Sequence, residues 1–504
     1  MQKPAARSCR PIRWQRNAAA MTTSTTGAPS PPTRLSIISW ALYDLANTTF
    51  SINIVSLYFS LWVVNTMGGA DKDYGYANSF SMALLFFTAP ILGAFSDQAG
   101  RRKPFLIATT LLCVAMTALL GAGGLTLSLA LFIGANYMFQ GGLIFYDSLL
   151  PAVSTEENRG RVSGLGIGLG YLGSFIGVAT GLLFLDRIGY TGIFRATALL
   201  FLLFALPCFL FVREPLVQGA GSLARVVRGA FSQTYGRGFR TIKHWPRYFA
   251  LWAGIGVGQG LLAVLLVALA GGKPQAWFIA AGALVGLVES VVLLPVVGPA
   301  LHATRYRGLA RFLVGRVFYT DPINSLIVFM GIYAANEVGF SQQETQGLLL
   351  VSIAVAVAGG ILWGVVVDRI GPKRTLNIVL VMWMVALAAV AAIGLLDLSR
   401  WLFWGVATMA GVALGGTWAA DRPYLLRLAP PQFVGEFYGL YAMVGRFASI
   451  IGPFLWGYVA DTLGMGRPAA VLSLLVFVVI AFVILQGVDD RPRNWTTGSA
   501  SGEP

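Results

Sequence analysis

The fold is decided by the stretch Gly93-Ala-Phe-Ser-Asp97-Gln-Ala-Gly100-Arg101-Arg102-Lys103, a short hydrophilic segment between two long apolar runs. Its pattern of spaced glycines, one aspartate and a basic cluster returns 271 residues later as Gly364-Val-Val-Val-Asp368-Arg-Ile-Gly371-Pro-Lys373-Arg374. A hydrophilic loop that is held between membrane-length segments, and that occurs once in each half of the chain, predicts a duplicated membrane protein.

The composition agrees with a membrane protein. Hydrophobic residues make up 56% of the chain and charged residues only 11%, whereas soluble domains carry roughly 25% charged residues. The net charge of +15 does not indicate nucleic-acid binding, because the basic residues lie in short segments between apolar runs and form no continuous face. The cysteines at positions 9, 113 and 208 are scattered, so we expect no disulfide, no metal site and no cofactor.

Twelve apolar runs are each close to the roughly 20 residues that a helix needs to cross a bilayer. They are residues 37–64, 76–96, 104–124, 126–150, 162–185 and 191–212 in the first half, and 309–334, 345–367, 375–396, 401–421, 437–460 and 468–487 in the second. Two further runs, 248–270 and 276–301, lie between the halves. We therefore expect an all-α integral membrane bundle of two six-helix halves, with 12 core spans and two inserted spans. A re-entrant hairpin is the alternative for the inserted pair.

The basic residues predict the orientation and the domain limits. With the N-terminus in the cytoplasm, 29 of the 36 Lys and Arg residues fall on the inside. Both termini and both glycine–aspartate loops are then cytoplasmic, in the inner membrane if the source is bacterial. The expected regions are a disordered tail (1–35), the first half (36–212), a basic linker with the inserted spans (213–308), the second half (309–487) and a C-terminal tail (488–504). The acid-free start could instead be a transit peptide, or translation could begin at Met21.

Other motifs repeat in the same register. Asp44-Leu-Ala-Asn47 corresponds to Asp321-Pro-Ile-Asn324, and Asp147 corresponds to Asp421. The pairs Gly160/Gly164 and Gly435/Gly439 follow the same offset, within a few residues. Together with the opening loops, these matches indicate a duplicated half.

The two loops resemble those between helices 2 and 3, and between helices 8 and 9, of the major facilitator superfamily. The stretches Trp40–Asn47, Thr241–Tyr248 and Pro430–Tyr441 resemble its vacuole-effluxer-like branch. The resemblance implies a bundle whose central cavity is lined by helices 1, 4, 7 and 10. It also implies a transporter of small solutes, since the best-known members of that branch export amino acids.

One acid then falls on each cavity helix. Acids inside membrane spans are costly and usually face a cavity or a partner, so these side chains could bind the substrate or carry a coupling proton or cation. They could instead be structural, paired with Arg316, Arg422 or Arg446. Arg446 itself could hold an anionic substrate group or neutralise one of the acids. The candidate binding and coupling residues are Asp44, Asn47, Asp147, Asp321, Asn324, Asp421 and Arg446.

The resemblance also predicts a role for the two loops. In that fold the first loop lies beside the cytoplasmic start of helix 11 and its copy beside the start of helix 5, here near residues 435–437 and 160–162. A helix N-terminus favours a carboxylate, so Asp97 and Asp368 are placed to latch the closed state. The alternative is that the basic clusters only fix topology. The candidate latch residues are Gly93, Asp97, Gly100, Arg101, Arg102, Gly364, Asp368, Gly371, Lys373 and Arg374.

The glycine-rich run 162–185 contains a nominal G-x-G-x-x-G, but it lies inside a predicted span, which argues against nucleotide binding. Gly173, Gly177 and Gly181 instead predict close helix packing. Without a phosphate-binding loop, ATP drive is not expected, and the resemblance to transporters implies that the chain is not an enzyme. We expect a secondary active transporter that works by alternating access, with amino-acid efflux as the candidate activity. The other hypothesis is a receptor or scaffold that kept the fold. The expected partners are a small solute, membrane lipids and a coupling proton or cation, and the expected state is a monomer.

Overall fold

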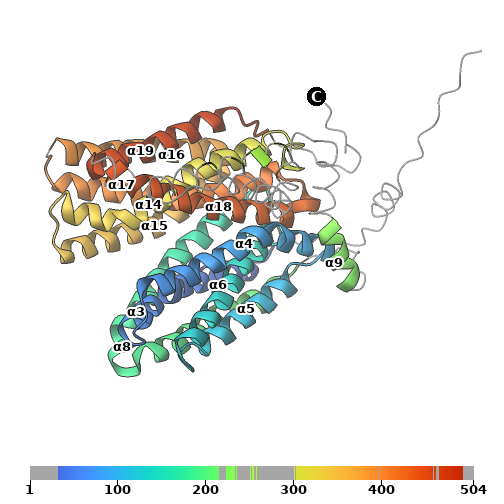
Figure 1. Cartoon of the computed structure of the whole chain (residues 1–504). Coiled ribbons are helices and arrows are strands. Elements are labelled where there is room, and N and C mark those ends of the chain that lie inside the picture. Colours follow the sequence, from blue (N-terminus) through green and yellow to red (C-terminus); the bar gives the residue numbers. More distant parts are fainter. Residues whose placement is uncertain are drawn as a thin grey trace, which may run out of the picture.

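The computed structural model describes residues 32–214, 223–232, 234, 300, 302–396, 398–457, 459–460 and 465–491, with a few single positions between 250 and 261. All regular structure in these ranges is helical. The helices form two bundles, blue to green for the first half and yellow to red for the second, which lie against each other (Figure 1). The all-α, two-bundle prediction is confirmed for this part of the chain.

The first half begins with three consecutive segments, α2 (Arg34–Phe50), η1 (Ser51–Leu57) and α3 (Tyr58–Asn65). The segment η1 is a π-helix, so the predicted run 37–64 is interrupted in its middle, and π-helical turns inside α-helices often occur at functional sites. The half continues with α4 (Asp71–Ala99), α5 (Lys103–Ala118), α6 (Leu125–Ser148), α7 (Leu150–Val153) and α8 (Arg159–Phe211).

Helix α8 covers two predicted runs, 162–185 and 191–212, which meet at Gly189. Gly189 has φ 65° and ψ 178°, a conformation that glycine adopts readily because it has no Cβ. The chain therefore turns between the two runs with almost no loop.

The second half consists of α14 (Leu309–Asn336), α15 (Gln342–Ile370), α16 (Pro372–Leu395), α17 (Trp401–Leu428), η3 (Pro431–Phe433), α18 (Val434–Gly457) and α19 (Gly466–Gln486). A short helix between the halves, α9 (Leu223–Phe231), packs on α4. The predicted inserted runs 248–270 and 276–301 lie outside the described residues, apart from single positions.

In the part of the chain that the structure describes, eight helices are long and apolar enough to cross a membrane, or up to nine if a bent pair within α14 is one span. Helix α8 counts once here although it covers two predicted runs, and α5 is apolar but shorter. The outer surface carries large apolar side chains, such as Leu182 at 79% and Leu362 at 66% exposure. Such a surface suits contact with lipid. The total of 12 plus 2 spans stays a prediction.

The predicted role of the glycines in α8 is confirmed. A Cβ built on Gly177 would lie 2.9 Å from Oδ1 of Asn53, and one on Gly173 would lie 3.1 Å from Oγ1 of Thr49. Since both positions face the first helix of the same half, glycine there lets the two backbones approach closely.

Candidate functional site

The carboxylate of Asp97, at the end of α4, caps the start of α18 in the other half. Its Oδ1 accepts a hydrogen bond from the backbone N–H of Gly435 at 2.8 Å, and its Oδ2 accepts one from that of Glu436 at 2.7 Å. Arg102 also lies 3.3 Å from Oδ1, and the Asp97 side chain is only 2% exposed. Two otherwise unpaired N–H groups of a helix N-terminus are thus satisfied by a residue from the opposite half.

Asp368, at the end of α15, makes the corresponding contact in the opposite direction. Its Oδ1 accepts from the backbone N–H of Gly160 at 2.6 Å, and its Oδ2 accepts from that of Arg161 at 3.1 Å. The Arg161 side chain adds an ion pair at 2.8 Å. The two contacts, which we call latches, join the halves at one end of the bundle, the latch end. Both contacts lie where the loop resemblance placed them; their role in conformational change stays a prediction.

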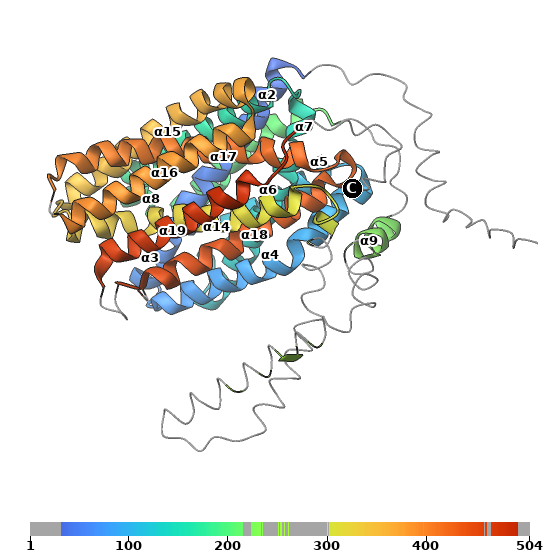
Figure 2. The same cartoon turned by 90° about the horizontal axis from the view of Figure 1, so that it is seen from above.

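The repeated glycines bring the latched helices together. A Cβ on Gly93 would lie 2.6 Å from the carbonyl carbon of Gly435, and a Cβ on Gly160 would lie 2.6 Å from the carbonyl oxygen of Gly364. Atoms this close would clash, so glycine is required where α4 crosses α18 and where α8 crosses α15. In both views α4 and α18 lie side by side (Figures 1 and 2).

The other two latch glycines end helices. Gly100 closes α4 with φ 64°, in the left-handed conformation, and Gly371 lies between α15 and α16 with φ 87°. Both angles favour glycine over any residue with a Cβ.

The basic residues of the two loops bind the ends of neighbouring helices, in addition to their contacts at the latches. Lys103 Nζ donates to the carbonyl of Val212 at 2.8 Å, and Lys373 Nζ donates to that of Gln486 at 3.0 Å. In each half, therefore, a lysine at the start of the third predicted span binds the C-terminal end of the sixth, where a cation is favoured. Arg101 and Arg374 are exposed.

Sequence reasoning missed Glu214, which caps the start of α5. Its carboxylate accepts hydrogen bonds from the backbone N–H groups of Arg102, at 2.7 and 2.8 Å, and of Lys103, at 3.0 Å. It also lies 3.7 Å from the Arg102 guanidinium. Because Arg102 pairs with Asp97 as well, Glu214 links the cap of α5 to the first latch.

Deeper in the bundle, Arg422 of α17 brings together two of the predicted acids. Its Nη1 lies 2.8 Å from Asp44 Oδ2, and its Nε lies 2.9 Å from Asp147 Oδ1. The guanidinium also lies over the rings of Trp40, at 5.9 Å, and Tyr146, at 5.5 Å. One cation from the second half is therefore held by two acids and two aromatic rings from the first half.

The third acid, Asp421, belongs to a separate cluster within the second half. Its carboxylate pairs with Arg316 at 3.0 Å and accepts hydrogen bonds from the hydroxyls of Tyr319 and Tyr441. Arg316 stacks on the Tyr441 ring at 3.4 Å. Asp44, Asp147 and Asp421 are therefore paired with arginines, as the structural alternative for these acids predicts. Their partners are Arg422 and Arg316.

The fourth acid lies apart from both clusters. Asp321 is 1% exposed, and its Oδ1 accepts from the backbone N–H of Gly452 in α18 at 2.7 Å. Among the described residues, its Oδ2 and both polar atoms of the buried Asn47 side chain lack hydrogen-bond partners. Asn324, one turn after Asp321, is partly buried. Arg446 hydrogen-bonds Gln140 of α6, so it contacts the first half through an amide.

A buried histidine adjoins the first latch. The Nδ1 of His302 lies 3.0 Å from Glu436 Oε1, with side-chain exposures of 5% and 0%. The ring stacks on Phe437. The backbone N–H of Glu436 donates to Asp97 in the first latch. The contact between His302 and Glu436 therefore holds a residue of that latch in place.

The structure is a helical bundle of two repeated halves. At one end, a carboxylate of each half caps a helix of the other half. These features define a class of polytopic membrane protein whose two halves meet at a pseudo-symmetric seam. The model of the Major Facilitator Superfamily matches residues 45–320, and that of the vacuole effluxer Atg22-like family matches residues 295–493. The chain belongs to the major facilitator superfamily.

Its relatives are of the same kind. An uncharacterized MFS-type transporter, YxiO, of Bacillus subtilis is 26% identical over 465 residues, which are 90% of this chain and 94% of the relative. Autophagy-related protein 22-1 of Neosartorya fischeri is 24% identical over 41% of this chain and 36% of its own.

Solved structures share the fold. A bacterial homologue of the iron transporter ferroportin, in its outward-facing state, has a TM-score of 0.60 at 15% identity, over 90% of this chain and 99% of its own. The transporter FucP, in its outward conformation, has a TM-score of 0.60 at 12% identity, over 90% of this chain and 97% of its own.

Proposed function

We propose that this chain is a secondary transporter that moves a small solute across a membrane by alternating access, and that the structure represents the state closed at the latch end. The observation that carries the proposal is the reciprocity of the latches. Asp97 of the first half caps α18 of the second, and Asp368 of the second half caps α8 of the first. The halves can separate at this end only if both contacts break, so the latches bias a two-state equilibrium.

Arg422 supplies a second link across the same seam, and it suggests how transport is coupled. Opening the latch end would pull Arg422 away from Asp44 and Asp147. A buried charge that loses its partner is strongly destabilised. Opening therefore requires something that replaces these ion pairs. Protons could neutralise the acids, or charged groups of the substrate could pair with the separated residues. A zwitterionic amino acid offers a carboxylate for Arg422 and an ammonium for Asp44, which makes amino acids the first substrates to test.

The sidedness of the proposal comes from the charges. Exposed basic residues, including Arg101, Arg369 and Arg374, gather at the latch end, and basic residues are retained on the cytoplasmic side of membrane proteins. We therefore assign the latch end to the cytoplasm. The closed latches then correspond to an outward-facing state, from which efflux or uptake can proceed.

Purified protein in liposomes tests the proposal. A thermal-shift screen across amino acids, sugars and drugs would first select ligands, and uptake and efflux of a labelled hit would then be measured with and without a pH gradient. Transport that is lost in Arg422→Gln, and retained in the distant exposed variant Arg187→Gln, supports the proposal. A protein that binds ligands tightly but moves none of them, under any gradient, would favour the receptor hypothesis.

A further inference from the structure

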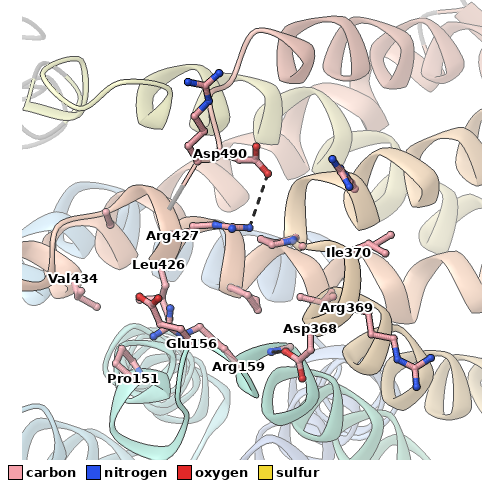
Figure 3. A pocket seen from close by; sticks show the side chains of 18 of the residues that line it. Pro151, Glu156, Arg159, Asp368, Arg369, Ile370, Leu426, Arg427, Val434 and Asp490 are labelled. Carbon is pink, nitrogen blue, oxygen red and sulfur yellow. Dashed lines mark hydrogen bonds and ion pairs between the residues drawn. The ribbon is translucent and has the colours of Figure 1, made fainter. Parts of the chain in front are cut away.

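A cavity of ≈ 700 Å³ opens at the latch end, on the seam between the halves (Figure 3). Its size falls in the range of small-molecule sites. Arg159 and Glu156 enter it from the first half, near the start of α8, while Arg369 and Arg427 enter it from the ends of α15 and α17. A molecule bound there would touch both halves at once.

The lining is rich in arginine. Six arginines face three acids, and the charged residues are Arg102, Arg159, Arg369, Arg374, Arg427, Arg491, Glu156, Asp368 and Asp490. Arg102 is already paired with Asp97 and Glu214. Asp368 is used by the second latch, and Arg427 meets Asp490 only at 4.0 Å. In the described part of the chain, Arg159, Arg369 and Arg374 form no ion pair. The cavity therefore carries a surplus of positive charge.

Arg159 and Arg427 define where in the cavity an anion would bind. They come from opposite halves, Arg159 from α8 and Arg427 from α17 above it in Figure 3. Burial lowers the pKa of Arg159 and the charge of Arg427 lowers it further, although Glu156 offsets part of this effect. The Nε of Arg159 is shielded from solvent and has no hydrogen-bond partner among the described residues. A buried N–H of a charged group is costly to leave unpaired, and an anion between the two guanidinium groups would relieve both penalties.

The remaining lining defines the shape of the occupant. Apolar side chains also line the cavity, among them Ile370, Leu426 and Val434. Guanidinium groups bind phosphate with two parallel hydrogen bonds. The site thus suits a molecule with a multivalent phosphate group and an apolar or ring-shaped part.

We propose that this seam cavity binds a phosphate-bearing anion that holds the two halves together and so stabilises the closed latch end. The inference rests on the proposed function only in treating the latch end as one that opens. Because the ligand contacts both halves only when they are closed, its binding and latch closure favour each other by the same factor. The anion would act as a regulator of the carrier rather than as its transported solute.

Binding is tested on the full chain in detergent, with pyrophosphate and ATP as probes and sodium chloride at matched ionic strength. We expect both probes to raise the thermal midpoint of the wild-type protein. Arg159→Gln and Arg427→Gln should each weaken binding by about ten-fold or more, while Arg187→Gln, beside the Gly189 turn in the middle of α8 and far from the cavity, should bind like the wild type. Equal midpoints with and without both probes, or equal binding by all variants, would overturn the proposal.

Two further arms identify the source of the phosphate and the effect on the latches. Nanodiscs with phosphatidylglycerol in place of phosphatidylcholine show whether a lipid headgroup gives the same Arg159-dependent stabilisation; if so, the phosphate is a lipid's. Spin labels at the exposed positions Thr155→Cys and Gln432→Cys, in opposite halves, should shift toward the short distance when pyrophosphate is added. A probe that binds without this shift contradicts the coupling. Neither readout requires transport, so their failure is distinct from a failure of the proposed function.

Discussion

Arg422 donates hydrogen bonds to both carboxylate oxygens of Asp44, at 2.8 and 3.4 Å, although the two residues are 378 positions apart in the sequence. The two side chains are 10% and 8% exposed. This pair links α17 of the second half to α2 of the first and, with Asp147, forms the charged centre of the seam.

The stability of the protein should depend on this pair. Arg422→Gln leaves two acids buried without their cation and should lower the free energy of unfolding by about 3–5 kcal/mol. Asp44→Asn should cost less, because Arg422 keeps Asp147. The double variant should be less destabilised than the sum of the two single variants. Equilibrium unfolding in detergent measures all three, and simple additivity would contradict a direct interaction.

The glycines where helices of the two halves cross should not tolerate replacement by a residue with a side chain. Gly93→Ala places a Cβ against the Gly435 carbonyl, and overpacking of this kind typically costs 1–3 kcal/mol. Since the clash exists only when the latch end is closed, the variant should favour the open state and slow transport. Gly405→Ala is the matched control, because its Cβ would meet no atom within 4 Å. Equal behaviour of the two variants in spin-label distances would argue against the crossing.

The cap on α5 should be visible in hydrogen exchange. Glu214→Ala removes the acceptor for the N–H groups of Arg102 and Lys103, and loss of a helix cap costs about 0.5–2 kcal/mol. We expect faster exchange of these two amides, with no change at the start of α16. In Glu214→Gln, which keeps an acceptor oxygen, the effect should be smaller. Unchanged protection in the alanine variant would show that the cap is dispensable.

The inserted runs can be tested directly. If residues 248–270 and 276–301 both span the membrane, an epitope tag between Gly271 and Pro274 will be reached by antibody from outside intact cells. A tag that becomes reachable only after permeabilisation would remove the two extra spans and favour 12 or a re-entrant hairpin.

Much of the latch end could be predicted from the sequence, because its information is local and occurs twice. The spacing of Gly93 and Asp97 recurs at Gly364 and Asp368, and the resemblance supplied the helix starts that they approach. What the repeat did not reveal was that Gly160 and Gly435, which lie at those helix starts, are the steric partners of Gly364 and Gly93.

The charged centre could be predicted only in part, because its arginines have no counterparts at the matching positions of the first half. At the offsets that relate the halves, Arg422 corresponds to Ser148, and Arg316 to Ser39. Both cations thus come from the second half. One reaches across the seam and the other stays within its own half, so Asp147 and Asp421 have different partners. Only the tertiary structure shows this, although an arginine inside an apolar run is itself a signal of a buried partner.

The most direct test of the account measures the open population at the latch end when one latch is removed. Spin labels at Thr155→Cys and Gln432→Cys would report the distance between the halves in the wild type, in Asp97→Asn, in Asp368→Asn, and in Asp186→Asn, an exposed carboxylate at the opposite end. A carboxylate at a helix N-terminus contributes up to about 2 kcal/mol when partly buried. Each latch variant should therefore raise the ratio of open to closed molecules by a few-fold to about 30-fold, while Asp186→Asn leaves it unchanged. Distance distributions identical to the wild type in both latch variants would contradict the account.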